Sequence, residues 1–514
     1  MKTKTTIGRK YAVVSGHALA TEAALDVLKA GGNPVDAAIA GGAVLTVALP
    51  QACTLAGDCF ILVHVGGRTY GLNGSGPSPA GLPADIGAEQ LSRGPLSSAV
   101  PGMLGALEAL HRRFGSRAWA ELMAPAASLA RDGVPASREF VASLKMNLDK
   151  LTQDPGHRAL YLPGGTPPAE GDMLRQPALA ATLERVAKEG AAALYGGWIG
   201  DRLCEALARL GGVMTRADLA AYRPLWVEPL SYDYRGRTVR VMPPNSYGLA
   251  MLLQLAALER APVGRHALGS PERLALLMRA ARAAFAIASP YIADPHVAGD
   301  RAADALAPAS LAALRTAFEG AAAAYPPRGQ GTAVISVGTA AGEGVTIVQS
   351  IFAPFGSFVA DAETGLIFNN RLHGFTTAPG HPNRAAPGKR PAHTLNPAMM
   401  FEGGRLAMQL GSPGGSGQTI TLTQVLTGVI DLQLDLEAAI AAPRWSMDLE
   451  GNFALEPEID ADMPRRLAAL GVAARPATED QRYYFGSAEC IAQDPRTGLR
   501  AVADFRREAA AGAG

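Results

Sequence analysis

The glycine-rich segment at residues 411–417 (GSPGGSG) is the part of the sequence whose composition most directly suggests chemistry. Consecutive glycines let the backbone approach a ligand closely, and N–H groups ahead of a helix attract negative charge. Such a loop suits a phosphate, or the oxyanion that develops when an amide carbonyl is attacked. It lacks the Lys-Ser/Thr ending of a P-loop and does not match the dinucleotide-binding fingerprint. An ordinary tight turn explains the same residues as well.

A second candidate is Thr332, which directly follows a connector rich in small residues, glycine and proline at 318–331. That composition is typical of an exposed segment open to cleavage, and also of an ordinary linker. A cut after Gly331 would leave a new α-amine, with an ordinary pKa of about 8, beside the Thr332 hydroxyl. One residue would then supply both nucleophile and general base. The alternative is that Thr332 simply begins a strand.

Other chemistries have little support in the sequence. There is no Gly-x-Ser-x-Gly elbow of a serine hydrolase. The four cysteines are too scattered for a disulfide framework, and the nine histidines show no zinc-ligand spacing. We therefore expect no metal and no other cofactor.

Composition and charge favour a small-molecule partner. Lys plus Arg number 47 and Asp plus Glu 46, so no strong field attracts nucleic acid or an anionic membrane. The apolar run at residues 11–14 is too short for a signal sequence, and the run at 35–49 is too short to span a bilayer. These features predict a cytoplasmic protein with no membrane partner.

The hydrophobic patterns predict an α+β fold. Helices are expected at 21–30, at 35–49, through most of 99–315 and at 418–430. Strands are expected at 60–65 and 68–72 around Gly66-Gly67, and at 332–337, 345–352 and 366–369. A helical N-terminal part and a sheet-rich C-terminal part are consistent with helices packed on both faces of stacked sheets.

Several blocks of this sequence, in order, resemble the γ-glutamyltransferase family of N-terminal nucleophile hydrolases. From Thr332 onward they are TAVISV, VTIVQSI at 345–351, FGS at 355–357, TGLIFNN at 364–370, PGKRP at 387–391, LNP at 395–397, GSPGGS at 411–416 and APR at 442–444. The N-terminal half adds AT at 20–21, GGNPVDAA at 31–38, GD at 57–58, VPG at 100–102 and residues 243–248. The resemblance covers nearly the whole chain.

This resemblance implies a four-layer αββα sandwich with a helical N-terminal portion. It implies one precursor cut between Gly331 and Thr332 into a large subunit, 1–331, and a small subunit, 332–514. Thr332 matches the nucleophile, and Ser350 matches a hydroxyl that hydrogen-bonds it. Gly414 and Gly415 match the residues whose amides form the oxyanion hole. The processed heterodimers could assemble further into a homo-oligomer.

The sequence departs from the family where a γ-glutamyl group is held. Residues 72–77 lack the Arg that binds the α-carboxylate, and Gly374 replaces the Asp that binds the α-amine. Phe352 replaces a substrate-contacting Asn, and His393-Thr394 replaces a Ser-Ser pair. Without the bidentate Arg and the opposite charge of the Asp, the site loses its electrostatic binding of the carboxylate and amine of an amino acid.

The predicted substrate-binding residues are Arg371, His393, Thr394 and Asn73. Arg371 is open to a structural interpretation as well, and His393 could be a core histidine. Arg390, a further candidate, is expected to brace its loop.

The predicted function is an autoprocessing threonine amidohydrolase that acts on a small amide or acyl-amine. The HTLNP, QSI and NGSG blocks resemble the branch of oxamate amidohydrolases and cephalosporin-acylase-like proteins, which favours an oxamate-type substrate. One alternative is a genuine γ-glutamyltransferase with rearranged substrate residues. Another is a non-catalytic binding homologue that never processes.

Overall fold

Two seven-stranded sheets form the centre of the protein. The structure, a computed structural model, describes residues 3–320, 331–447, 452–494 and 496–514. The first sheet has the order β21 (Ala510–Ala513), β2 (Tyr11–Ser15), β10 (Gly331–Thr339), β11 (Gly344–Phe352), β3 (Asp58–Val65), β4 (Arg68–Gly74), β7 (Leu225–Val227). The second has the order β1 (Lys4–Gly8), β20 (Gly498–Ala503), β19 (Glu489–Asp494), β15 (Arg405–Gly411), β14 (Ala398–Glu402), β9 (Arg237–Val241), β8 (Leu230–Tyr234). Neighbouring strands in both sheets are antiparallel.

The two sheets meet through an apolar layer, which we call the interlayer. Val334, Val348 and Phe60 of the first sheet pack with Met399 and Phe401 of the second. Beside them, Ala12 and Val14 of β2 pack with Ile491, Leu499 and Ala501 of β19 and β20. Alternate side chains of each strand therefore point into a shared core, as in other face-to-face sheet packings.

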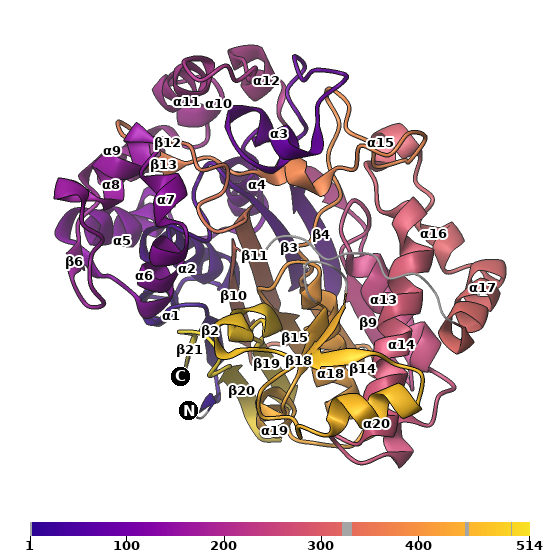
Figure 1. Cartoon of the computed structure of the whole chain (residues 1–514). Helices are drawn as coiled ribbons and strands as arrows, with labels where there is room; N and C mark the ends of the chain where they lie inside the picture. Colours follow the sequence, from indigo (N-terminus) through magenta and orange to yellow (C-terminus); the bar gives the residue numbers. More distant parts are fainter. Residues whose placement is uncertain (1–2, 321–330, 448–451, 495) are drawn as a thin grey trace.

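Helices cover the outer faces of both sheets (Figure 1). On the first sheet lie α1 (Ala18–Lys29), α2 (Pro34–Ala48) and α4 (Met103–Phe114), and α5 (Trp119–Asp132) packs outside them against α2 and α9 (Pro177–Glu189). On the second lie α13 (Gly248–Leu258) and α18 (Gly417–Asp431), and α14 (Pro271–Ala288) packs outside them against α13. Helix α2 is buried along its whole length, because its alanines and glycines allow close packing on all sides. Its start is set by a capping box between Asn33 and Asp36.

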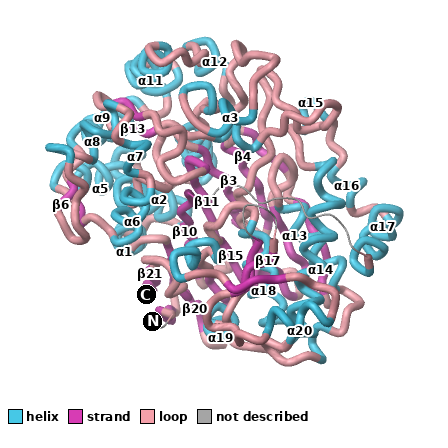
Figure 2. Tube along the Cα trace, in the orientation of Figure 1, coloured by secondary structure: helices cyan, strands magenta, loops and turns pink. Residues whose placement is uncertain are grey.

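Shorter elements surround this centre (Figure 2). The remaining α-helices are α3 (Ala88–Ser92), α6 (Arg138–Met146), α7 (Leu148–Leu151), α8 (Pro155–Tyr161), α10 (Ala192–Tyr195), α11 (Trp198–Ala208), α12 (Arg216–Ala221), α15 (Pro295–Ala298), α16 (Ala302–Ala305), α17 (Pro308–Glu319), α19 (Leu436–Ala441) and α20 (Met463–Ala469). The remaining strands are β5 (Val134–Pro135), β6 (Met173–Leu174), β12 (Ala360–Asp361), β13 (Leu366–Ile367), β16 (Trp445–Met447), β17 (Phe453–Leu455) and β18 (Ala474–Pro476). Within the described ranges, no helix is both long and apolar enough to cross a membrane.

The predicted mixture of helices and sheets is confirmed. The hairpin predicted around Gly66-Gly67 is β3–β4, and both glycines have the positive φ that its tight turn requires. Residues 99–315 are mainly helical, but the prediction missed strands β7, β8 and β9 within them. An alternating LSYDY–RTVRV pattern around Arg235-Gly236 was the available signal. Residues 321–330 of the predicted connector lie outside the described residues.

Candidate active site

Three polar residues of the first sheet lie in one row across neighbouring strands. Thr332 of β10 pairs with Ser350 of β11, and Ser350 pairs with Asp58 of β3. Two positions further along each strand, Val334, Val348 and Phe60 lie in the interlayer core. Because strand side chains alternate, the three polar side chains face the same layer, at its end. All three are buried.

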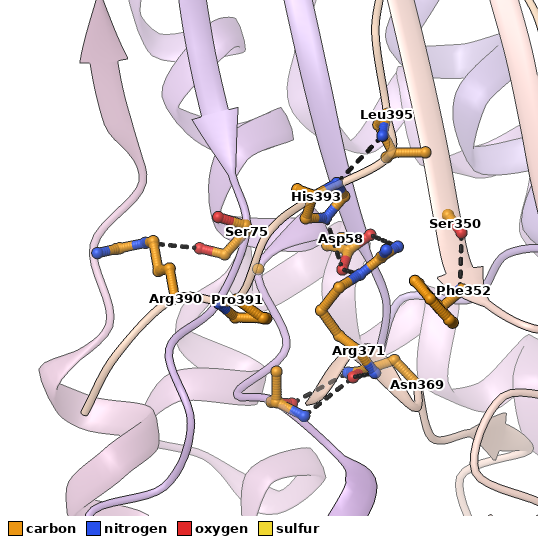
Figure 3. Close-up of polar contacts among 12 residues, drawn as sticks. Asp58, Ser75, Ser350, Phe352, Asn369, Arg371, Arg390, Pro391, His393 and Leu395 are labelled. Atoms are coloured by element: carbon orange, nitrogen blue, oxygen red, sulfur yellow. Dashed lines mark hydrogen bonds and ion pairs between the residues drawn. The ribbon is translucent and has the colours of Figure 1, made fainter. Parts of the chain in front are cut away.

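Ser350 is hydrogen-bonded to the peptide group that precedes Thr332. Its hydroxyl donates to the carbonyl oxygen of Gly331, where a register irregularity separates Gly331 from Thr332. The same hydroxyl oxygen accepts the N–H of Phe352 at 2.7 Å (Figure 3). Because a carbonyl oxygen can only accept a hydrogen bond, the Ser350 hydroxyl is the donor to Gly331.

The backbone around this hydrogen bond is tightly constrained. A Cβ on Gly331 would lie 2.8 Å from the carbonyl group of Ala353, so only glycine fits there without movement. Phe352 has a φ of +81°, an unfavourable conformation for a bulky residue. That conformation accompanies the N–H contact to Ser350. Strained backbone of this kind is common at functional sites.

The glycine-rich loop lies against the strand that carries Thr332. A Cβ on Gly411 would come within 2.4 Å of a Val334 methyl group, so the loop leaves β15 in direct contact with β10. Gly414 and Gly415 have φ values of +120° and +61°, which favour glycine. Among the residues that the structure describes, no acceptor is recorded for their two amides. The loop ends at the N-terminus of α18, where an anion is favoured.

Asp58 forms a buried ion pair with Arg371. The guanidinium Nε lies 2.6 Å and Nη2 2.9 Å from the two carboxylate oxygens, a bidentate arrangement (Figure 3). Burial acts to raise the pKa of Asp58, but Arg371 and the His393 ring outweigh it and hold that pKa below its usual value. The pair thus places two opposite charges beside Ser350.

Arg371 retains one donor that the described residues do not use. Its Nη1 is buried and has no hydrogen-bond partner among them. The guanidinium also lies 4.6 Å from the ring centroid of Phe352, within cation–π range. Arg371 therefore has both a structural contact, with Asp58, and a free N–H.

His393 is a fully buried ring that contacts the same carboxylate. Its Nδ1 accepts the N–H of Leu395, so Nε2 carries the hydrogen, and Nε2 lies 3.0 Å from Asp58 Oδ2. Burial and the nearby Arg371 charge lower the pKa of His393 to about 4, so the ring is neutral at neutral pH. Thr394 follows it and is also buried.

Asn73 and Arg390 are held by neighbouring loops. The Asn73 side chain donates to Asn245 at 2.9 Å and accepts both the N–H and the hydroxyl of Ser75. The Arg390 side chain donates to the backbone carbonyls of Ser75 and Arg223, as expected for a brace. Both side chains organise the loop that carries His393, whose own N–H donates to the Asn245 carbonyl.

The position of Gly374 is closed by backbone. A Cβ built there would lie 2.4 Å from the carbonyl oxygen of Ala392. An aspartate at this position would therefore require the backbone around Ala392 to move.

Asp58 lies in the site, although the sequence indicates it only as part of the GD block at 57–58. The strand at 58–65 begins with this charged residue, and its other residues except His64 are apolar. A buried charge needs a partner, so Asp58 could have been predicted to have one. The partner itself could not be identified, because Arg371 is distant in sequence. Within the described part of the chain, no group of three or more His, Cys, Asp or Glu residues is placed to hold a metal.

Comparison with known proteins identifies the family of this chain. The family pattern described as Gamma-glutamyltranspeptidase matches residues 20–514. The glutathione hydrolase-like YwrD proenzyme of Bacillus subtilis (strain 168) is 34% identical, with 86% of each chain covered. The oxamate amidohydrolase proenzyme of Klebsiella pneumoniae is 32% identical, with 86% of this chain and 88% of the relative covered.

Among solved structures, the cephalosporin acylase of Bacillus halodurans has a TM-score of 0.90 and 29% identity, covering 100% of this chain and 97% of that one. The chain therefore belongs to the γ-glutamyltranspeptidase family of N-terminal nucleophile hydrolases. It is an enzyme of that family, whose relatives are named as hydrolases and acylases.

Proposed function

We propose that this protein is an autoprocessing amidohydrolase that uses Thr332 as its nucleophile. The observation that carries the proposal is the Ser350 hydrogen bond to the Gly331 carbonyl, next to the Thr332 side chain. It gives the Gly331–Thr332 peptide bond a fixed donor of the kind that stabilises a developing oxyanion.

In the proposed self-cleavage, the Thr332 hydroxyl oxygen attacks the carbonyl carbon of Gly331. The carbonyl oxygen becomes negative and is stabilised by the Ser350 hydroxyl. The C–N bond then breaks as the nitrogen takes up the proton that the Thr332 hydroxyl gives up, which leaves an ester between Gly331 and Thr332 Oγ1 and a free α-amine on Thr332. Water hydrolyses the ester and yields the Gly331 carboxylate.

In the proposed turnover, the α-amine accepts the Thr332 hydroxyl proton while the oxygen attacks the substrate amide. The amides of Gly414 and Gly415 stabilise the oxyanion, since no acceptor for them is recorded in the described ranges. The amine leaves with a proton, and an acyl ester remains on Thr332. Water or an amine acceptor then releases the acyl group.

The proposed substrate is a small amide of the oxamate type and not a γ-glutamyl compound. The closed backbone at Gly374 supports this, because it leaves no room for the family's amine-binding aspartate. The unused Nη1 donor of Arg371 supports a substrate oxygen as its acceptor. Contacts of the substrate with His393, Thr394 and Asn73 stay predictions.

A second candidate is a glutathione hydrolase with rearranged substrate residues. It is favoured by one observation, the 34% identity to a relative named glutathione hydrolase-like. A panel of oxamate, glutaryl amides and γ-glutamyl anilides, assayed on one preparation, distinguishes the two candidates. Preferred hydrolysis of the γ-glutamyl anilide would overturn the oxamate-type assignment.

We further propose that residues 1–331 and 332–514 are the two subunits of a four-layer αββα sandwich. Both segments contribute strands to each sheet: β2 of the first segment lies between β21 and β10 of the second, and β9 of the first pairs with β14 of the second. Interleaved strands would hold the cleaved segments together. A cytoplasmic location and assembly into a homo-oligomer stay predictions.

The test of self-cleavage uses a denaturing gel and N-terminal sequencing. The wild type should give two fragments, one of which starts at Thr332. A Thr332→Ala variant should remain one chain and be inactive, whereas Thr332→Ser, which keeps a hydroxyl, should still cleave. An intact wild-type chain, or cleavage of the alanine variant, would refute the mechanism.

A further inference from the structure

The segment at residues 352–358, which we call the strained turn, begins at the end of β11, two residues after Ser350. Phe352, Phe355 and Phe358 have φ values of +81°, +60° and +59°. Bulky residues rarely adopt this region of backbone conformation, because it crowds their side chains against the main chain. Such a conformation persists only where the surrounding structure holds it. The contacts of the strained turn are therefore informative.

The strained turn lies directly on the Gly331 peptide group. Gly331 is the strand partner of Phe352. A Cβ on Gly331 would lie 2.8 Å from the carbonyl carbon and the carbonyl oxygen of Ala353, and 3.1 Å from the Pro354 nitrogen. The position of Ala353 therefore limits where the Gly331 carbonyl group can lie.

The middle and the end of the strained turn are held by the N-terminal segment of the chain. The Phe355 N–H donates to the Gln51 carbonyl at 2.9 Å, and the Gly94 N–H donates to the Ser357 carbonyl at 2.8 Å. The Phe355 ring also packs on Phe140, with ring centroids 6.0 Å apart. These contacts leave the first residues of the turn to be held by other groups.

Asn370 holds those first residues. Its side-chain carbonyl accepts the N–H of Ala353 at 3.0 Å, and its side-chain amide donates to the Ser92 carbonyl at 2.7 Å. Its backbone N–H donates to the Ile351 carbonyl at 3.2 Å. The residue is only 1% exposed. Asn370 thus ties Ala353, which packs on Gly331, to Ser92 at the end of α3.

We propose that Asn370 is a positioning residue for self-cleavage. It holds Ala353 against Gly331, which keeps the Gly331 carbonyl on the Ser350 hydroxyl and beside Thr332. Asn370 itself contacts Ala353 and not the reacting atoms. The inference rests on the proposed cleavage between Gly331 and Thr332, and it adds a residue that the proposed mechanism does not include.

The neighbouring Arg371 is positioned by different contacts. Its backbone N–H donates to the Asn369 side chain at 3.0 Å, and its guanidinium is paired with Asp58 (Figure 3). Removal of the Asn370 side chain leaves these hydrogen bonds in place. An effect of that removal on cleavage therefore reports on the contact with Ala353.

The experiment follows the self-cleavage of freshly synthesised, full-length chain on a denaturing gel. Asn370→Ala should slow cleavage by about 100-fold, because a misplacement of about 1 Å at a reacting group can cost that much. Cleavage of this variant at the wild-type rate would overturn the proposal.

The matched control is Asn383→Ala. The Asn383 side chain also accepts one backbone N–H, that of Ala392 at 2.9 Å, and donates to one backbone carbonyl, that of Gly374 at 2.8 Å. It is fully buried as well. This variant loses the same kinds of hydrogen bond and should still cleave at close to the wild-type rate. Equal slowing in both variants would mean a general loss of stability and would contradict a positioning role.

A conservative variant, Asn370→Asp, separates positioning from the mere presence of a buried side chain. The neutral acid has a carbonyl oxygen for the Ala353 N–H and an O–H for the Ser92 carbonyl, as asparagine has. The ionised form has no donor, and the Ser92 carbonyl oxygen repels it. At pH 5 this variant should recover most of the rate lost in Asn370→Ala, and the recovery should shrink toward pH 8. Rates equal to those of Asn370→Ala at both pH values would overturn the proposal.

The two levels of inference fail in different ways. A wild-type chain that stays intact would refute the proposed cleavage itself. A wild-type chain that cleaves, together with an Asn370→Ala variant that cleaves equally fast, would refute the role of Asn370 alone.

Discussion

Ser350 donates a hydrogen bond to the carbonyl oxygen of Gly331, the oxygen of the peptide bond that joins the two proposed subunits. The same Ser350 is the strand partner of Thr332. The Ser350 side chain therefore contacts the peptide bond that is proposed to be cut. It also lies beside Thr332, the proposed nucleophile, so the proposed cleavage and the proposed active site share this side chain.

Replacement of Ser350 by alanine should slow self-cleavage by roughly 100- to 1000-fold, the usual effect of losing one oxyanion donor. A time course on a denaturing gel measures the rate. The control is Ser336→Ala, which removes a buried hydroxyl from the same strand pair, where it contacts Thr346 at 3.1 Å. Equal rates in the two variants would show that the Gly331 contact does not assist cleavage.

Removal of the Arg371 side chain should destabilise the protein strongly. Arg371→Ala leaves the Asp58 carboxylate buried without its bidentate partner, which costs about 3–5 kcal/mol of unfolding free energy. Arg93→Ala breaks an exposed helical pair with Glu89 and should cost less than about 1 kcal/mol. Denaturant unfolding of both variants gives the comparison. If both variants lost a similar amount of unfolding free energy, the buried pair would stabilise the fold no more than the exposed pair does.

His393 should make the protein less stable in mild acid. Its pKa in the folded protein is about 4, below the ordinary value of 6.5. Between those values the unfolded chain binds a proton that the folded chain does not, so unfolding becomes easier as the pH falls. The contribution is at most about 1.4 kcal/mol per pH unit.

The measurement is denaturant unfolding of wild type and His393→Gln at several pH values between 4.5 and 7. The stability gap between them should narrow as the pH falls, because the variant lacks the titrating ring. His296→Gln, on an exposed residue, is the control and should show a constant gap. If the difference in unfolding free energy between wild type and His393→Gln were also constant with pH, the His393 ring would not be held neutral by burial.

Restoring the family's aspartate at Gly374 should not restore γ-glutamyl recognition. The new Cβ would meet the Ala392 carbonyl oxygen at 2.4 Å, so Gly374→Asp should destabilise the protein and gain no γ-glutamyl anilide hydrolysis. Gly196→Asp is the matched control, because a Cβ there meets nothing within 4 Å. Thermal unfolding and the anilide assay test both parts. Strong new anilide hydrolysis would mean that the amine site is still intact.

The two fragments of the processed protein should stay together under native conditions. Separation of residues 1–331 from 332–514 would break strand pairs in both sheets, including β2 with β10 in the first and β9 with β14 in the second. We expect one peak in native size-exclusion chromatography, of the mass of the whole chain or a multiple, and two bands on a denaturing gel. Elution of free fragments without denaturant would contradict the interleaved arrangement.

Features that depend on neighbours a few residues apart can be predicted from the sequence. The β3–β4 hairpin follows from Gly66-Gly67, which accept positive φ, and the start of α2 follows from Asn33 and Asp36. The glycine-rich loop before a helix was visible in the same way. Local composition indicates only that Thr332 begins a strand. The order of the sequence motifs is what predicts it as the nucleophile.

Contacts between residues far apart in the sequence follow only from the tertiary structure. The row of Thr332, Ser350 and Asp58 depends on strand register, which is set by the packing of two sheets. The pairing of Asp58 with Arg371 and the closure at Gly374 depend on loops that cross from other parts of the chain. Local sequence does not predict these contacts, because residues become buried only in the folded chain. Only there does each buried charge meet the partner that it needs.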